Sequence, residues 1–442
     1  MDAPAKLFTD DVVAQKAANP VMYGEVDFDH LPERFTDVFD TANANVGAFS
    51  KHLPRLLENT ERVNLIRNYT MMGDRVADAY AALIPEYGFK RLVEMLELAC
   101  DKGVQAVEGA PEELKTFIEA MEEKPDWLDM DLVEEGARLE RNVAAHAAPY
   151  FVRGALIATY MNKYSALPMA MTGTLSGGQA AKRAFETSAF FGITVMPGAL
   201  DRFREGFKAA AKVRLMHSMV RFHLLRSPDW DKSVYGVPIP QVDQMPAGNI
   251  NIFLLSAMVL REGRTEFTPT ERARVEMARY RCFLLGLPEE LVGSTPQEII
   301  DLLLTRHVTL RAGYDDATCG ELVRATMRAK LSDDTSLTGR IKTGIERGIS
   351  KLFFVNNFCE KDFKRAEEIG VPVTAGDRFW AVAGALTIFA RLRFFGFATR
   401  NKYLKDWADR ILVRKLAQRL ASYGHAEFET DAARYKAKTV TA

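Results

Sequence analysis

The stretch that decides the fold is Phe203–Arg226, FREGFKAAAKVRLMHSMVRFHLLR, which is bounded by turn residues at both ends. Its length and composition predict one long helix, with His217 near the middle. At about 100° per residue, Arg214 lies about 60° and Arg221 about 40° around the helix axis from His217. One face of this helix is therefore expected to present an imidazole between two guanidinium groups.

An imidazole between two cations is the combination that a haem requires. The iron takes a neutral nitrogen ligand, and the two propionates take cations. This makes His217 a candidate axial ligand. The alternative is a core histidine that is bound to a backbone carbonyl. His223 is the weaker candidate, since it lies about 120° around the axis from His217 and has no flanking arginines on its own face.

The composition indicates a folded protein with a large core. The chain has 442 residues, 48% of them hydrophobic, and a formal net charge of −1. These values exclude the disordered and collagen-like classes. A net charge this small argues against nucleic-acid binding through a basic field. The N-terminal segment has no apolar signal-peptide region, and we expect a cytoplasmic protein.

The sequence predicts neither a membrane span nor a disulfide framework. The stretch closest to a membrane span, around Ala144–Met161, is interrupted by His146, Pro149 and Arg153. The cysteines lie far apart in the sequence and form no CxxC pair, a pattern typical of reduced thiols in a cytoplasm rather than of a zinc site. They are Cys100, Cys282, Cys319 and Cys359.

Apolar residues recur at spacings of three and four along most of the chain, whereas strand-like alternation is almost absent. We therefore expect an all-α fold with one large helical domain over residues 1–442. It would have an N-terminal arm at 1–50, a core segment at 125–261 and additional surrounding helices. Helices are expected at 53–87, 90–100, 111–123, 125–142, 149–161, 180–192, 249–261, 268–285 and 403–423, with a core helix at 378–393 and a loop at 171–178.

Several familiar motifs are excluded. Leu175–Gln179 spells the LSGGQ signature of transporter ATPases, but a phosphate loop needs Lys-Ser/Thr after its last glycine, and Gln179-Ala180 follows Gly178. None of the seven histidines has a glutamate three residues before it, as di-iron bundles require. No HExxH or GxSxG sequence occurs either. Common metal and hydrolase chemistries are therefore poorly supported.

A second polar group precedes the long helix. Arg183, Glu186 and Thr187 are spaced so that all three side chains can share one side of a helix. The same helix would carry Phe185 and Phe190, which suggests a polar spot in an apolar cavity. The alternative is a solvated Arg–Glu face.

Together these elements resemble a known family. Arg183-x-x-Glu186-Thr187 is followed thirty residues later by His217 within Arg214–Arg221, and then by GVPIPQVD at Gly236–Asp243. This series is similar to the latex-clearing (rubber oxygenase) and mycophenolate-pathway MpaB-type oxygenase family. The likeness is clearest from about Pro125 to Arg261.

The resemblance implies a b-type haem in an all-helical fold with a globin-like core. It makes His217 the proximal iron ligand, with Arg214 and Arg221 as partners of the propionates. It places Arg183 and Thr187 on the distal side, where Glu186 is a further catalytic candidate. Members of this family use dioxygen to cleave or oxidise carbon–carbon double bonds of isoprenoids, so the implied partners are dioxygen and a small lipophilic alkene.

One position departs from the family pattern. Rubber-cleaving members have a lysine immediately before the threonine, and this chain has Glu186 there. A carboxylate cannot replace an ammonium group as a cap on the iron. The departure favours a smaller intracellular isoprenoid over rubber. Two other functions stay open: a haem-binding or peroxidase-like protein without alkene cleavage, and a cofactor-free helical protein that binds lipids or a partner helix.

Overall fold

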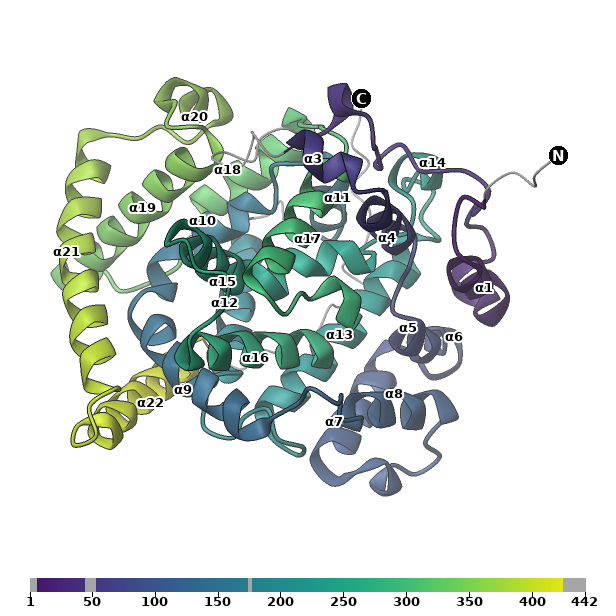
Figure 1. Ribbon diagram of the computed structural model, residues 1–442, viewed down its shortest axis with the longest axis horizontal. Helices are drawn as coiled ribbons and strands as arrows, with labels where there is room; N and C mark the ends of the chain where they lie inside the picture. Colours follow the sequence, from purple (N-terminus) through teal and green to yellow (C-terminus); the bar gives the residue numbers. More distant parts are fainter. Residues whose placement is uncertain (1–5, 44–52, 174–176, 424–442) are drawn as a thin grey trace. The chain divides into compact units, whose positions relative to one another are not determined.

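The computed structural model describes residues 6–43, 53–173 and 177–423. Within these ranges the backbone forms helices, turns and loops, with two isolated bridges, Phe35–Leu310 and Ala42–Arg311, and no strand. The predicted all-α fold is confirmed. The backbone contacts divide the chain into two compact units, whose helices are labelled in Figure 1. Of the described residues, unit 1 contains 6–133 and 200–312, and unit 2 contains 134–199 and 313–423.

The helices of unit 1 surround a set of small apolar cores. One core brings together Ile66, Val242, Met245 and Cys282, and another joins Leu56 to Val308. In chain order the helices are α1 (Asp10–Ala18), α2 (Pro20–Tyr23), α3 (Leu53–Glu58), α4 (Thr60–Thr70), α5 (Arg75–Ala81), α6 (Ile84–Tyr87), α7 (Phe89–Lys102), α8 (Glu112–Glu122), α13 (Glu205–Leu224), α14 (Lys232–Tyr235), α15 (Gln241–Arg261), α16 (Pro269–Leu284) and α17 (Pro296–Thr309), with short turns η1 (Phe39–Thr41), η3 (Val104–Ala106) and η4 (Glu289–Leu291).

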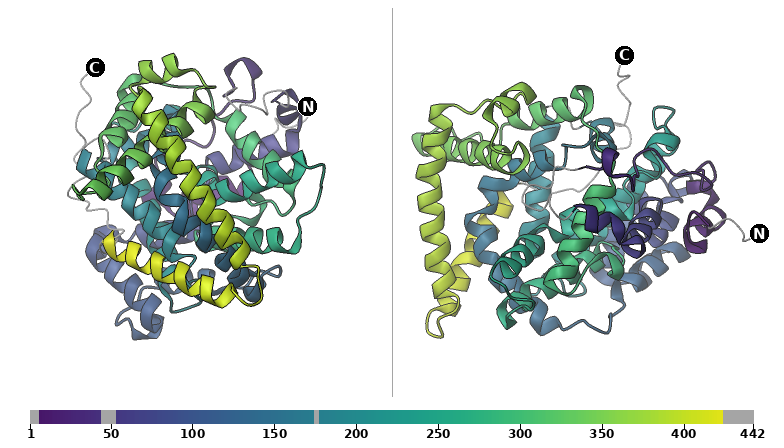
Figure 2. Two further views of the ribbon diagram at one scale, coloured as in Figure 1. Left: turned by 90° about the vertical axis from the view of Figure 1, so that its left-hand side faces the viewer. Right: turned by 45° about the horizontal axis from the view of Figure 1, so that its top comes forward.

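The helices of unit 2 include the longest apolar segments of the chain. They are α9 (Met130–His146, from Glu134 on), α10 (Ala148–Ala158), α11 (Lys163–Met171), α12 (Gly177–Ile193), the π-turn η5 (Asp316–Gly320), α18 (Glu321–Arg328), α19 (Leu337–Phe358), α20 (Phe363–Ile369), α21 (Ala375–Ala398) and α22 (Lys405–Ser422). The long helix α19 packs against both α10 and α21 (Figure 2).

Helix α10 is mostly apolar, and its one charged residue, Arg153, belongs to a buried ion pair. Arg153 is 1% exposed and donates through Nε and Nη2 to the two carboxylate oxygens of Glu346, at 2.9 and 3.0 Å. Its Nη1 donates to backbone carbonyls at the end of α18. A buried guanidinium is tolerated when it is paired and its donors are used. Arg153 therefore fixes α10 to α19 instead of reaching solvent.

The expected helix at 53–87 is four helices in the structure. Asn59 begins α4, because its Oδ1 accepts a hydrogen bond from the backbone N–H of Arg62 at 2.9 Å. Asp74 begins α5 in the same way, with Ala77 as the donor at 3.1 Å. Such side-chain caps supply partners for the free N–H groups of a helix start, and they divide an otherwise continuous apolar pattern.

The expected core segment and the expected N-terminal arm each correspond to several helices of the structure. The expected core segment, residues 125–261, contributes to both units, and the single domain over 1–442 stays a prediction. The expected arm contains α1, α2 and η1, while its residues 1–5 and 44–50 lie outside the described ranges. In the expected loop at 171–178, α11 ends at Met171 and α12 begins at Gly177, and residues 174–176 are likewise outside the described ranges.

The prediction that residues 378–393 form a core helix is wrong in one respect. The segment is helical, within α21, but one side of it is exposed, including Phe379, Leu386 and Phe389. α21 is also the described helix that is long and apolar enough to cross a membrane, by length and composition alone. The periodicity of an apolar helix does not reveal which of its faces a neighbour covers.

Candidate functional site

Helix α13 carries the predicted haem ligand. It begins at Glu205, two residues later than expected, because Phe203 has a positive φ of 69° and Arg204 takes the N-cap position. His217 is half-buried near the middle of this helix. Arg214 and Arg221 are both buried, at 6% and 0% exposure. The three residues predicted to act together therefore share one helix of unit 1.

Arg214 is bound to a carboxylate from α5. Its Nε and Nη2 donate to the two oxygens of Asp74, at 2.5 and 2.9 Å, in a bidentate pair. Asp74 therefore caps α5 and anchors α13 at the same time. Gly286, at a positive φ of 78°, packs against this pair, and a Cβ there would clash with both partners. A guanidinium and a carboxylate in this geometry form one of the stronger ion pairs that proteins make.

Arg221 forms hydrogen bonds with a carboxylate and with two backbone carbonyls. Its Nη1 donates to Asp78, and its Nε and Nη2 donate to the carbonyl oxygens of Pro238 and Ile239, at 3.0 and 2.5 Å. Tyr23 donates its hydroxyl to the other oxygen of Asp78. Burial raises the pKa of the Asp78 carboxyl, and the positive charge of Arg221 opposes that shift. α13 is thus tied to α5 by two buried ion pairs.

These contacts bear on the role predicted for the two arginines. Both guanidinium groups are already bound to protein carboxylates, so the contacts give them a positioning role, which is to fix the orientation of α13. A direct bond from either arginine to a haem propionate stays a prediction. The spacing of the residues allows both ion pairs to form. Arg214 and Arg221 are two helical turns apart on α13, and Asp74 and Asp78 are about one turn apart at the start of α5 and within it.

His217 lies at the end of a chain of hydrogen bonds from α15. Its Nδ1 is 3.2 Å from Oε1 of Gln244. Gln244 donates through Nε2 to Oε1 of Gln241, at 2.8 Å. Gln241 donates through its own Nε2 to the carbonyl oxygens of Gly73 and Gly286, at 3.2 and 3.1 Å. We call the pair Gln241 and Gln244 the glutamine relay. Both residues are buried, at 3% and 6% exposure.

The glutamine relay assigns the tautomer of His217. Backbone carbonyls can only accept, so they fix Gln241 with its NH₂ group toward them and its oxygen toward Gln244. That oxygen fixes Gln244 in turn, with its own oxygen toward the ring. Nδ1 of His217 must therefore carry a proton, and in the neutral imidazole the lone pair lies on Nε2. A histidine that binds iron typically donates its other ring N–H to a neighbouring acceptor, so the donor set at His217 fits an axial haem ligand.

The segment Gly236–Asp243 supports the site from one side. Two of its carbonyls bind Arg221, and its Gln241 belongs to the glutamine relay. Its last residue, Asp243, accepts hydrogen bonds from Arg34 and Arg306, each with a contact of 2.7 Å. Burial raises the pKa of Asp243, but these two arginines together bring it below its ordinary value. This clamp fixes the start of α15, from which both relay glutamines project.

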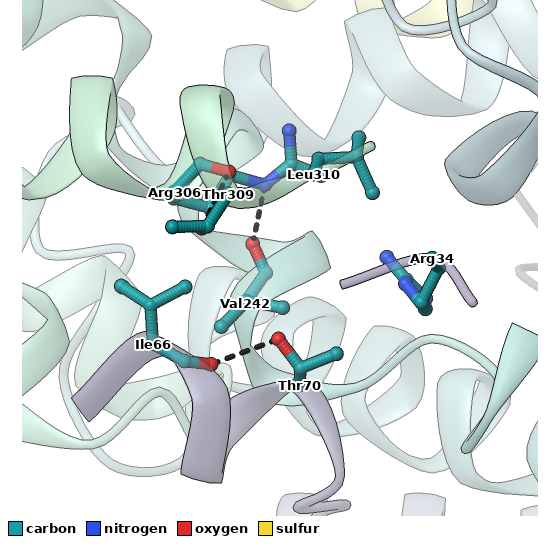
Figure 3. Close-up of a pocket in the computed structure, with 7 residues that line it drawn as sticks. All are labelled: Arg34, Ile66, Thr70, Val242, Arg306, Thr309 and Leu310. Carbon is teal, nitrogen blue, oxygen red and sulfur yellow. Dashed lines mark hydrogen bonds between the residues drawn. The ribbon is translucent and has the colours of Figure 1, made fainter. Parts of the chain in front are cut away.

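A small cavity of about 10 Å³ lies beside this clamp, and the residues around it are shown in Figure 3. One water molecule needs about this volume, so the cavity is too small for a substrate. Arg34 lines it, and Nε and Nη1 of Arg34 have no hydrogen-bond partner among the described residues. The full lining is Arg34, Ile66, Thr70, Val242, Arg306, Thr309 and Leu310.

The second predicted group lies on α12 in unit 2. Arg183, Glu186 and Thr187 are all half-buried, and the helix is held by Ala184, which belongs to the core of this unit. Phe185 stacks on Tyr423 at a centroid distance of 5.3 Å. Sharing one helix at spacings of three and four, the three polar residues lie on one side, as predicted.

Glu186 has a cation close to it on its own helix. Nζ of Lys182 lies 3.8 Å from Oε1 of Glu186, with the two side chains 38% and 22% exposed. A lysine one turn earlier thus neighbours this carboxylate. The catalytic roles predicted for Arg183, Glu186 and Thr187 stay predictions.

Comparison with known proteins agrees with the resemblance. Residues 141–340 match the family model described as "ER-bound oxygenase mpaB/B'/Rubber oxygenase, catalytic domain". A similar curated protein is the rubber oxygenase of Streptomyces sp. (strain K30), which is 25% identical over 233 residues, 50% of this chain and 55% of that protein. The chain thus spans about half the length of this relative. The resemblance to the latex-clearing and MpaB-type oxygenase family is confirmed.

A solved structure shares the fold. The structure of latex clearing protein in the closed state aligns with a TM-score of 0.55 and 18% sequence identity, covering 80% of this chain and 91% of that one. At this identity the likeness concerns the fold alone. It supports the all-α class independently of the sequence match.

The glutamine relay can be tested without haem. In ¹⁵N-histidine-labelled apoprotein, His217 is expected to show a protonated Nδ1 and an unprotonated Nε2, because Gln244 accepts from Nδ1. The Gln244→Leu variant removes that acceptor and should give averaged ¹⁵N shifts for the two ring nitrogens. Gln418→Leu, at an exposed glutamine of unit 2, should leave the signals unchanged. A wild-type His217 with the proton on Nε2 would contradict the relay.

Proposed function

We propose that this chain is a haem-b-dependent oxygenase that uses dioxygen to cleave or oxidise carbon–carbon double bonds of a lipophilic, isoprenoid-like substrate. The observation that carries the proposal is His217, with Nδ1 bound by a directional glutamine relay on a helix anchored by two buried ion pairs. The family match over residues 141–340 supports the oxygenase class. A rubber oxygenase among the relatives supports an alkene as the substrate.

In this proposal the residues of α13 and α15 hold the cofactor. His217 offers its Nε2 lone pair, while Gln244 and Gln241 keep the proton on Nδ1 and fix the plane of the ring. Arg214 and Arg221 hold α13 against α5, so the imidazole keeps one direction. When bound, the haem supplies the iron centre at which dioxygen is activated.

The residues of α12 are proposed to act on the reacting groups. The guanidinium of Arg183 and the hydroxyl of Thr187 can donate hydrogen bonds that orient dioxygen and stabilise developing negative charge. The Glu186 carboxylate can accept or return a proton at its Oε atoms. Nζ of Lys182 lies 3.8 Å from this carboxylate. Glu186 in place of the lysine is our reason to favour a small isoprenoid over rubber.

The test is oxygen uptake by the haem-loaded protein with squalene and with a polyisoprene latex as separate substrates, together with capture of carbonyl products by dinitrophenylhydrazine. We expect oxygen consumption and carbonyl formation, with squalene the better substrate. A haem-loaded protein that consumes no oxygen with either substrate would favour a haem-binding or peroxidase-like function instead.

Variants of α12 test the proposed distal residues in the same assay. Arg183→Ala and Thr187→Val should keep the haem spectrum and lose about 10²-fold in turnover, the effect typical of removing one donor to a transition state. Ser188→Ala is the matched control, since its hydroxyl donates to the carbonyl of Ala184 in its own helix, at 2.7 Å. Wild-type turnover in both variants would remove the assigned role.

A further inference from the structure

The outward side of α21 carries a row of exposed apolar side chains. They recur at spacings of three and four, with one eight-residue interval, and so form one stripe along the helix. The members of the stripe are Phe379 (64% exposed), Val382 (62%), Leu386 (69%), Phe389 (63%) and Phe397 (62%). Only 22% of the most apolar 18-residue window of α21 is buried. Exposed apolar patches of this extent mark sites of interaction with a partner or a membrane.

The other side of α21 packs against α19 of the same unit (Figure 2). Ala381 and Ile388 join Ile349 in a common core. Gly348 of α19 lets the two backbones approach closely, because a Cβ there would clash with the carbonyl of Asp377. One face of α21 is therefore fixed within the protein, and the stripe lies on the remaining face.

The charged residues along the stripe are basic, and the first acidic residue after them is the exposed Asp406, just before Trp407. From Arg378 to Lys405 the sequence contains no aspartate or glutamate, and six basic residues occur among these 28 positions. All six are exposed, and none is in a salt bridge with a carboxylate of the described ranges. The carboxylate just before this segment, Asp377, is bound to Lys351 at 2.8 Å. The six are Arg378, Arg391, Arg393, Arg400, Lys402 and Lys405.

The combination of an apolar stripe with basic residues indicates what binds to the outward face of α21. In a symmetric dimer built on the stripe, Arg393 and its neighbours would face the same cations of a second copy, without a carboxylate to pair with. Crossing a bilayer is also disfavoured, since one face of α21 is committed to α19 and Arg391 and Arg393 interrupt its second half. An apolar stripe with basic residues beside it is typical of a helix that lies in a membrane interface.

We propose that the outward face of α21 is a docking surface for a membrane that contains anionic lipids. The stripe inserts among the acyl chains near the headgroups, and the basic residues beside it and just after α21 contact the lipid phosphates. Arg391 is not among them, because it lies on the side of Gly384 and Ile388 that packs against α19. Tyr403 and Trp407, which are 80% and 41% exposed just after α21, extend the surface with side chains that favour the interface. The proposal does not depend on haem or on the oxygenase function.

The test is sedimentation of the full-length protein with two kinds of vesicle, one of phosphatidylcholine alone and one of equimolar phosphatidylcholine and phosphatidylglycerol. We expect binding to the anionic vesicles that weakens as salt is raised. The double variant Leu386→Gln/Phe389→Gln should bind at least about tenfold more weakly, because it removes two inserted side chains. Arg393→Glu should weaken binding about fivefold or more.

Leu254→Gln is the matched control, since Leu254 is a 59% exposed leucine on α15 in unit 1. It should bind as wild type does. All the changed residues are exposed, so circular dichroism should show wild-type folding. Wild-type protein that stays in the supernatant with anionic vesicles overturns the proposal, as does wild-type binding by the double variant. A wild-type dimer in lipid-free buffer that the double variant converts to a monomer would assign the surface to a second copy instead.

Discussion

Replacement of His217 by alanine is expected to abolish haem binding, with a Soret absorbance at least about tenfold below that of wild type at equal protein concentration. The reason is that an imidazole whose Nδ1 is held by Gln244 offers its Nε2 lone pair, and alanine offers no ligand. The measurement is the absorption spectrum together with haem content by the pyridine haemochrome assay. Far-ultraviolet circular dichroism should stay that of wild type, because His217 is only half-buried.

The matched control is His223→Ala on the same helix. His223 lies about 120° around the axis from His217. The expectation that no arginine lies on its face is wrong, because Arg226, three residues on, together with burial lowers the pKa of the His223 imidazole. Removing it should leave the Soret band in place. An intact haem spectrum in His217→Ala, or loss of haem only in His223→Ala, would contradict the assignment of the axial ligand.

Replacement of Asp78 by asparagine is expected to cause the largest loss of stability. Asp78 and Arg221 are both fully buried, so the variant leaves a guanidinium in the interior without a counter-charge. Removing one partner of a buried pair costs about 3–5 kcal/mol. For a unit of this size we expect the melting temperature to fall by about 10 °C or more. Differential scanning calorimetry at neutral pH measures the change.

An exposed ion pair provides the comparison. The side chains of Lys115 and Glu112 are 44% and 76% exposed, with 2.7 Å between Nζ and Oε2, and solvent screening makes such exposed pairs contribute little to stability. Glu112→Gln should therefore change the melting temperature by no more than about 2–3 °C. Equal shifts in Asp78→Asn and Glu112→Gln would show that the pair between α5 and α13 does not anchor the site helix.

Several features of the site could be predicted from the sequence because they are local. The face of α13 depends only on helical geometry, so His217, Arg214 and Arg221 could be placed together in advance. The same holds for Arg183, Glu186 and Thr187 on α12. The all-α class followed from the apolar spacing. These predictions required no knowledge of which helices pack against which.

The partners of these residues could not be predicted in the same way. Asp74 and Asp78 precede Arg214 and Arg221 by 140 and 143 residues, and their four-residue spacing on a helix was the only available signal. Gln241 lies within the GVPIPQVD segment, and Gln244 follows that segment. The sequence of a glutamine does not indicate that its side chain binds a histidine. The exposure of α21 was missed because composition reports apolarity and not which face a neighbour covers.

The central claim is that His217 serves a haem in this chain, and the absorption spectrum of the wild-type protein from haem-supplied cells tests it most directly. We predict a Soret band and about one equivalent of iron per chain, as expected for a single b-type haem. A colourless protein without iron by elemental analysis would contradict the account and favour a cofactor-free helical protein.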